Sequence, residues 1–99
     1  MSIYERAIKC FGEQIQFVVA MEECSELIRA LSKVIREGKA DQAFCFQQLA
    51  EEVADVQIML DQMKVILDGE GSSDWELVRE AKLDRLDRLI EDTMAMRDF

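Results

Sequence analysis

The sequence predicts an all-α fold, and three observations support this prediction. The 99-residue chain contains no proline and only four glycines, the residues that most often interrupt helices. Its apolar residues recur at spacings of three and four, which is the period of an amphipathic helix. No segment of useful length shows the strict alternation of apolar and polar residues that is typical of strands. We therefore expect a single domain over residues 1–99 that is built from helices.

Two helices are expected in the first 37 residues, separated at Gly12. Ser2 and Glu5 have the spacing of a capping box, in which each side chain bonds to the backbone N–H of the other residue. Beyond Gly12, nothing in the sequence interrupts a helix before Glu37. The stretch 38–41 then combines a glycine suited to end a helix with an aspartate suited to begin one, which predicts a tight turn.

A third long helix and a final helix are expected after this turn. The third follows an apolar pattern over residues 42–67. A loop is expected over 68–73, because glycine, serine and acidic residues cluster there. Ser73 and Glu76 form a second capping box, and the last helix is expected over 74–95.

The net charge of −9 limits the classes of partner. A strongly acidic surface repels nucleic acid polymers and anionic membranes, so we expect the chain to bind neither. No apolar run approaches the roughly 18 residues that a membrane span requires, and no targeting segment is recognisable. We therefore expect a cytoplasmic protein. The same acidity suits the binding of divalent cations, although acidic residues also serve simply as a solvated surface.

The three cysteines, Cys10, Cys24 and Cys45, do not form a metal-binding motif. They are far apart in sequence, and the chain has no histidine to complete a zinc site. Their odd number fits a reducing compartment. We expect all three to be small buried hydrophobic residues.

The expected helices are long for so short a chain. A helix of 25 residues measures about 37 Å, whereas a compact domain of this size has a radius of gyration of about 13 Å. Long helices therefore leave apolar faces that the chain cannot cover by itself. We expect a homodimer or a homotetramer to cover them.

Four carboxylates occur within the apolar patterns of the second and third helices. Glu23 and Glu26 are three residues apart, as are Glu52 and Asp55, so each pair shares one helix face. If the two helices pack antiparallel through these faces, the four carboxylates converge. Buried like charges are unfavourable without a counter-ion. Magnesium, which prefers carboxylate and water oxygens, would neutralise them.

The alternative is that these acids are ordinary solvated residues, since acidic pairs three apart are common on helices. Glu22 and Glu51 each precede a proposed ligand and point about 100° away from it on an ideal helix. We expect these two to face solvent or to lie behind the ligands.

The two acidic runs resemble the signature of a known family. Residues 22–26 read E-E-x-x-E, residues 52–55 read E-x-x-D, and 25 residues separate them. This is similar to the MazG-like branch of the all-α nucleoside triphosphate pyrophosphohydrolases. The agreement extends to the flanking segments and covers roughly residues 3–90; the flanks are 16–21, 27–31, 56–60 and 80–86. The resemblance implies a four-helix-bundle-type MazG-like fold, with long antiparallel helices completed by oligomerisation.

The resemblance also implies an activity, namely magnesium-dependent hydrolysis of (deoxy)nucleoside triphosphates to the monophosphate and pyrophosphate. Manganese would substitute for magnesium, and removal of non-standard nucleotides is the usual role of the family. Glu23, Glu26, Glu52 and Asp55 would be the metal ligands. Glu23 or Glu26 would also orient the attacking water or accept its proton.

Three further residues acquire expected roles from the resemblance. Lys82 and Arg85, in a segment similar to the family's basic last helix, would contact phosphates. Gln16 would lie near the base or sugar, or would be a polar group at the rim of the bundle. Lys33 and Arg36 are lesser candidates for phosphate contact. Each basic residue also has a simpler interpretation as a solvated side chain.

Three other functions are compatible with parts of the pattern. A di-iron carboxylate bundle uses inward-facing glutamates but normally needs E-x-x-H pairs, and the chain has no histidine. A non-enzymatic helical dimerisation or adaptor protein explains the apolar stripes but not the paired acids within them. A catalytically silent nucleotide binder would retain every proposed ligand.

Overall fold

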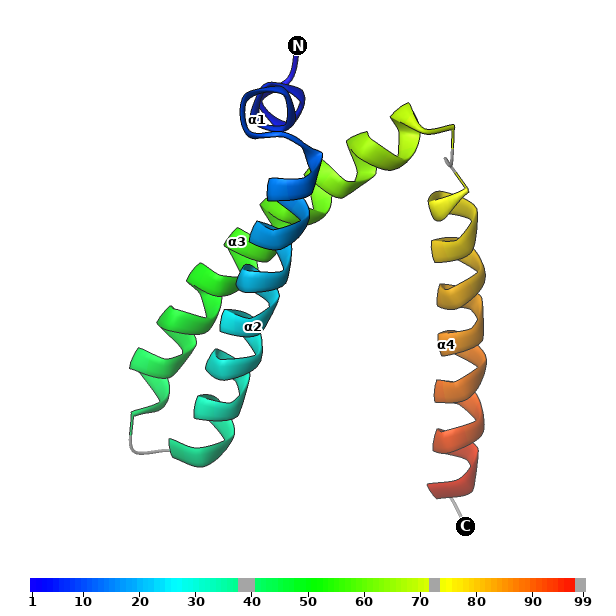
Figure 1. Cartoon of the computed structure of the whole chain (residues 1–99). Helices are drawn as coiled ribbons and strands as arrows, with labels where there is room; N and C mark the ends of the chain where they lie inside the picture. Colours follow the sequence, from blue (N-terminus) through cyan, green and yellow to red (C-terminus); the bar gives the residue numbers. More distant parts are fainter. Residues whose placement is uncertain (38–40, 72–73, 98–99) are drawn as a thin grey trace. The chain divides into compact units, whose positions relative to one another are not determined.

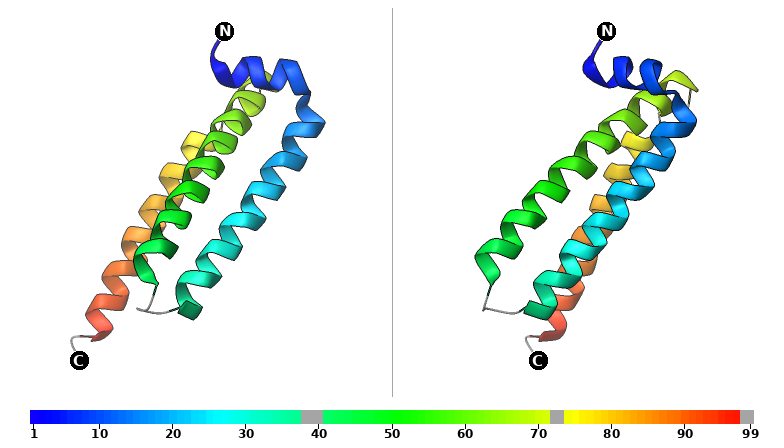
Figure 2. Two further views of the ribbon diagram at one scale, coloured as in Figure 1. Left: turned by 90° about the vertical axis from the view of Figure 1, so that its left-hand side faces the viewer. Right: turned by 60° about the vertical axis from the view of Figure 1, so that its left-hand side comes forward.

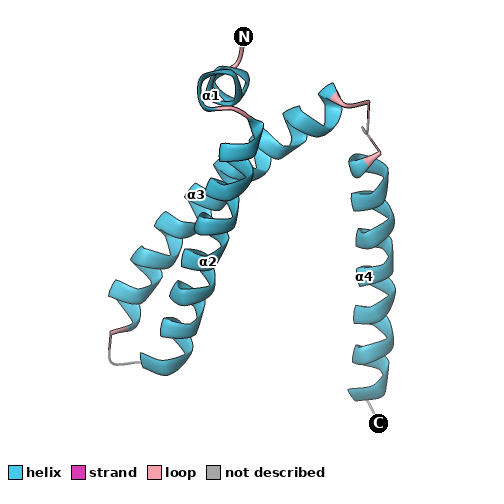
Figure 3. Ribbon diagram, viewed as in Figure 1, coloured by secondary structure: helices cyan, strands magenta, loops and turns pink. Residues whose placement is uncertain are grey.

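Four α-helices make up most of the computed structural model, which describes residues 1–37, 41–71 and 74–97 (Figures 1 and 3). No strand occurs within these described ranges. The all-α prediction is therefore confirmed. The helices are α1 Ile3–Phe11, α2 Glu13–Glu37, α3 Gln42–Gly69 and α4 Trp75–Arg97.

The start of α1 and its separation from α2 agree with the sequence prediction. The Ser2 hydroxyl accepts a hydrogen bond from the Glu5 backbone N–H at 3.1 Å, and the Glu5 carboxylate accepts one from the Ser2 N–H at 3.3 Å. Gly12 ends α1 with a φ of +90° and a ψ of 150°, a combination that is essentially restricted to glycine. The capping box and the break at Gly12 are both confirmed.

The end of α3 differs from the prediction by two residues. The sequence pattern places the last helical residue at Leu67, but α3 continues to Gly69. The left-handed glycine lies further along, at Gly71 with a φ of +75°, and its N–H donates to the Asp68 carbonyl at 3.2 Å. Gly71 is thus the residue that turns the chain away from the helix axis, which explains the longer helix.

Other predicted boundaries are tested only in part. At the start of α3, the Cys45 N–H donates to the Asp41 carbonyl at 3.0 Å, as expected when Asp41 immediately precedes the helix. Gly38 and Ser73, the predicted capping residues, lie outside the described residues. The final helix, expected over 74–95, runs from Trp75 to Arg97.

The chain separates into two compact units, Met1–Ile66 and Leu67–Phe99, which are described individually here. The first unit holds α1, α2 and most of α3; the second holds the end of α3 and α4. A single domain over 1–99 stays a prediction. None of the helices in the described residues is long and apolar enough to cross a membrane.

Within the first unit, α2 and α3 lie side by side and run antiparallel (Figures 1 and 2). Two side-chain hydrogen bonds between the helices establish this direction, because Gln16 bonds to Gln62 and Lys33 bonds to Gln48. The residue number rises along one helix as it falls along the other. The core between the helices is small; its buried residues are Gln16, Ala30, Cys45, Val56, Met59, Gln62 and Ile66.

A row of exposed apolar side chains runs along α2 on another face. Ile28 is 67% exposed and Ile35 is 82% exposed, although both are large aliphatic residues. The row repeats with alternating steps of four and three residues, which is the heptad spacing of a coiled-coil seam. We call this row the outer stripe of α2; its members are Phe17, Met21, Cys24, Ile28, Leu31 and Ile35.

The expectation that all three cysteines are buried is wrong for two of them. Cys45 is buried in the core at 2% exposure, but Cys10 and Cys24 are exposed. Cys24 belongs to the outer stripe, so its small apolar side chain follows the helical pattern without facing α3. On α3, Phe46 and Val53 also belong to the predicted apolar stripe, yet they are 47% and 51% exposed.

Candidate metal centre

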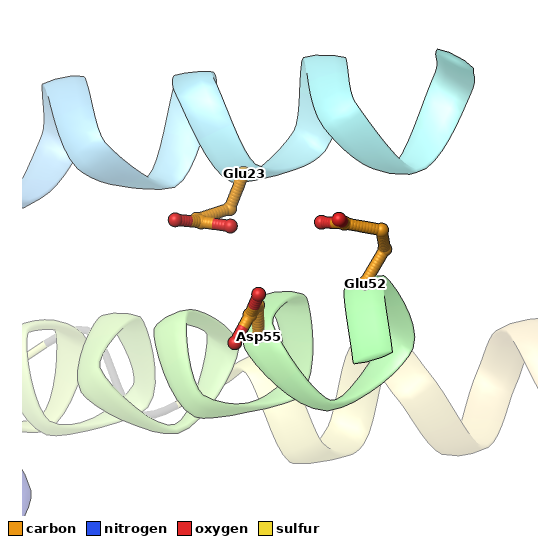
Figure 4. Close-up of side chains that lie close together, drawn as sticks. All are labelled: Glu23, Glu52 and Asp55. Atoms are coloured by element: carbon orange, nitrogen blue, oxygen red, sulfur yellow. The ribbon is translucent and has the colours of Figure 1, made fainter. Parts of the chain in front are cut away.

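Three of the four predicted ligands come together between α2 and α3. Glu23 extends from α2, and Glu52 and Asp55 extend toward it from α3 (Figure 4). One carboxylate oxygen from each residue lies within 4.8 Å of the other two. The local sequence explains this placement, because Glu52 and Asp55 each lie four residues before a buried residue of the same helix face, Val56 and Met59 respectively.

Two oxygens of this group are buried without a hydrogen-bond partner. Glu23 and Glu52 are half-buried, and the Oε2 atom of each is hidden from solvent without a donor among the described residues. Buried polar atoms in folded proteins nearly always have a partner, because removal from water is otherwise unfavourable. A bound cation would supply the partner that these two oxygens lack.

The electrostatics of the group disfavour the charged state of its members. Burial raises the pKa of Glu23 above its ordinary value, and the neighbouring charges of Glu26, Asp55 and Glu52 raise it further. The pKa of Glu52 is raised by the same effects, with burial first, followed by Glu26 and Asp55. Crowded carboxylates without a counter-ion behave in this way, and a divalent cation reverses the effect.

Glu26, the fourth predicted ligand, is exposed and lies outside the group of oxygens within 4.8 Å. It is nevertheless close enough to raise the pKa of both Glu23 and Glu52. The predicted convergence of four carboxylates is therefore realised as three close groups with Glu26 beside them.

A pocket of about 330 Å³ adjoins the carboxylates and contains two basic side chains. Lys33 donates a hydrogen bond to the Gln48 side-chain oxygen at 3.3 Å, and its ammonium lies 5.4 Å from the centre of the Phe44 ring. Sequence reasoning missed Arg29 and Gln48. The signal for Arg29 was its position three residues after Glu26, on the same helix face. The residues that line the pocket are Glu26, Arg29, Ala30, Lys33, Gln48, Glu51 and Glu52.

Gln16, expected near a base or sugar, lies in the core. Its side-chain amide donates a hydrogen bond to the Gln62 side-chain oxygen at 2.6 Å, and both residues are 5% exposed. The Gln62 amide in turn donates to the Met59 sulfur at 3.6 Å. Gln16 therefore joins α2 to α3, and its contact with a nucleotide stays a prediction.

The remaining predicted residues are distributed over both units. Arg36 is exposed and does not line the pocket. Lys82 and Arg85 lie on α4, in the second unit, so their contact with phosphate stays a prediction. Glu22 and Glu51 are both exposed, as expected, but Glu51 also lines the pocket and raises the pKa of Glu52.

The chemistry of this centre follows from its donor set. Carboxylate oxygens from two neighbouring helices are ligands for hard divalent cations, of which magnesium and manganese are the common catalytic examples. The adjoining basic side chains add the capacity to bind an anion. Comparisons with protein-family models, curated proteins and solved structures found no match to this chain.

Proposed function

We propose that this protein is a magnesium-dependent, MazG-like nucleotide pyrophosphohydrolase that converts nucleoside triphosphates to the monophosphate and pyrophosphate. The observation that carries the proposal is the group formed by Glu23, Glu52 and Asp55, with two buried oxygens that lack partners. The two-part acidic motif supports it from the sequence. Removal of non-standard nucleotides is the role suggested by the same resemblance.

The residues present fit a hard divalent cation. Glu23, Glu52 and Asp55 would hold it, and Glu26 would complete the set from the side of the pocket. Magnesium usually retains several waters, so a site with few protein oxygens and an open side suits it. Manganese, which accepts similar oxygen ligands, would substitute.

Bound magnesium would neutralise negative charge on the substrate phosphates and make water a better nucleophile near neutral pH. Glu26 would orient the attacking water and accept its proton, because it is exposed and close enough to raise the pKa of both Glu23 and Glu52. Glu23 is the alternative base. A bond forms between the water oxygen and the α-phosphorus. The bond from that phosphorus to the bridging oxygen breaks, and its electron pair leaves with pyrophosphate.

Basic side chains would offset the charge that develops on the leaving pyrophosphate. Lys82 and Arg85 on α4 keep this role as a proposal from the family resemblance. This chemistry requires no serine, cysteine or histidine nucleophile, in keeping with the absence of histidine from the chain.

The experiment is a pyrophosphate-release assay with a panel of nucleoside triphosphates, with and without magnesium. The wild-type protein should release pyrophosphate only with the metal. Glu52→Gln and Asp55→Asn should abolish turnover while circular dichroism shows unchanged helicity. Glu22→Gln serves as the control, because Glu22 is an adjacent acidic residue outside the ligand group. Near-normal turnover by either ligand variant would show the assignment to be wrong.

We further propose that the protein is a homodimer in which the outer stripe of α2 packs against a second copy. The stripe has heptad spacing, and isolated helices with such a seam associate to remove it from water. A homotetramer would form if a further apolar face also pairs.

A non-enzymatic dimerisation protein is the second candidate function, and the exposed outer stripe is the observation that favours it. This candidate does not account for the buried, partnerless oxygens of Glu23 and Glu52. Absence of pyrophosphate release across the panel, together with absence of a thermal shift by magnesium and a non-hydrolysable nucleotide, would favour it over both a hydrolase and a silent binder.

A further inference from the structure

We infer that the pocket beside the carboxylates is a binding site for the pyrophosphate part of a substrate, with Arg29 and Lys33 as its anion-binding residues. This inference rests on the proposed function, in which pyrophosphate is the leaving group. It gives a role to Arg29, which sequence reasoning missed, and a more specific role to Lys33, which was a lesser candidate for phosphate contact.

The position of the two cations suits a phosphate chain that begins at the metal centre. Arg29 and Lys33 follow Glu26 by three and seven residues, so they lie on one face of α2. An ideal helix places them about 4.5 Å and about 10.5 Å beyond Glu26 along its axis. A chain of phosphates that begins at the carboxylates and extends through the pocket would therefore meet Arg29 first and Lys33 second.

Both cations are available for an anion. Three glutamates line the same pocket, yet neither Arg29 nor Lys33 forms an ion pair with them or with any other described residue. Lys33 is instead held by Gln48 and lies above the Phe44 ring, contacts that orient its ammonium without neutralising it. Two neighbouring cations that no described carboxylate neutralises thus line this pocket, which suits a negatively charged ligand.

The lining of the pocket favours phosphate over a nucleobase. Among the described residues that line it, Ala30 is the only apolar one and none is aromatic. Arginine offers a fork of donors that binds two phosphate oxygens at once, and lysine offers a compact charge. The three glutamates that line the pocket would select an anion that arrives with a divalent cation, because they would repel a bare polyphosphate.

Titration calorimetry with inorganic pyrophosphate in the presence of magnesium tests this inference directly. Arg29→Gln and Lys33→Gln should each weaken binding at least about ten-fold, as expected for loss of a charge-assisted hydrogen bond. Arg6→Gln is the control, because it removes the same charge from an exposed position of α1 outside the pocket. Lys33→Arg, which keeps the charge, should restore most of the affinity. Circular dichroism of each variant establishes that the helices are intact.

The outcomes separate this inference from the proposed function. If Arg29→Gln and Lys33→Gln bind pyrophosphate as the wild type does, or if Arg6→Gln weakens binding equally, the pocket assignment is overturned while turnover can stand. If the wild type binds pyrophosphate through Arg29 and Lys33 but releases none from any nucleotide, the hydrolase is overturned and the anion site stands. Failure of the wild type to bind magnesium pyrophosphate overturns the anion site.

Discussion

The side-chain amide of Gln16 on α2 donates a 2.6 Å hydrogen bond to the side-chain oxygen of Gln62 on α3, within the core between the helices. On α2, Glu23 lies two helical turns after Gln16 and on the same face. On α3, Asp55 lies two turns before Gln62 and on the same face. Both acids belong to the carboxylate group. The glutamine pair thus sets an antiparallel register that brings these acids opposite each other. Because a buried amide without its partner is unfavourable, the hydrogen bond disfavours other registers.

Replacing one glutamine should destabilise the protein substantially. Gln62→Leu leaves the Gln16 amide buried without an acceptor, which we expect to lower the free energy of unfolding by about 1–3 kcal/mol. Gln57→Leu is the control, because Gln57 is exposed on the same helix and its bond to Asp61 is at the surface. Urea unfolding measures both. Equal stability of Gln62→Leu and the wild type would contradict this expected loss.

Removing one charge from the carboxylate group should stabilise the metal-free protein. Burial and the neighbouring acids raise the pKa of Glu23, so its ionised form is disfavoured in the folded state. Glu23→Gln should therefore raise the thermal midpoint by a few degrees without metal, and should lose the stabilisation that we expect magnesium to give the wild type. Glu22→Gln should change neither. A lower midpoint for Glu23→Gln in metal-free buffer would contradict this account.

Stability of the metal-free protein should depend on pH with a defined sign. The folded-state pKa values of Glu23 and Glu52 are raised above their ordinary value of 4.5. Between pH 4.5 and these raised values, the folded protein therefore binds more protons than the unfolded chain. The contribution of these groups is therefore fully present below pH 4.5 and is lost as the pH rises through the raised values. Urea midpoints measured from pH 4.5 to neutrality should show this loss, and saturating magnesium should reduce it. A Glu23→Gln/Glu52→Gln variant that keeps the full dependence would exclude these groups as its source.

The outer stripe of α2 should mediate self-association. Ile28→Asp places a charge in the centre of the seam and removes a large apolar side chain, which we expect to weaken dimerisation at least about ten-fold. Ser32→Asp adds the same charge to an exposed position of α2 outside the stripe, and should leave the dimer intact. Sedimentation equilibrium measures both. A wild-type protein that is monomeric at micromolar concentration would contradict the proposal.

The junction between α1 and α2 should not tolerate a side chain at Gly12. Its φ of +90° with a ψ of 150° is strained for any L-residue, although the space around it is open. Gly12→Ala should therefore lower the free energy of unfolding by about 1–3 kcal/mol through backbone strain alone. Gly69→Ala, at the end of α3 with open space and no positive φ, should be neutral or slightly stabilising. Chemical unfolding of the two variants distinguishes strain from a general effect of losing glycine.

The sequence by itself determined the helices and the pairing of acids on each helix. The capping box of Ser2 with Glu5 and the break at Gly12 are local, because each depends on residues a few positions apart. The three-residue spacing of Glu52 and Asp55 likewise places both on one face before any packing is known. Local hydrogen bonds and helical geometry were sufficient for these predictions.

Only the tertiary structure decided which faces meet. Helix α2 carries apolar residues on more than one face, so periodicity alone did not show that Cys24 points away from α3 or that Gln16 enters the core. It also did not show that Glu26 stands beside the other acids or that Arg29 shares a pocket with Gln48. These facts depend on the register between helices that are distant in sequence, and that register follows from packing and buried hydrogen bonds across the pair.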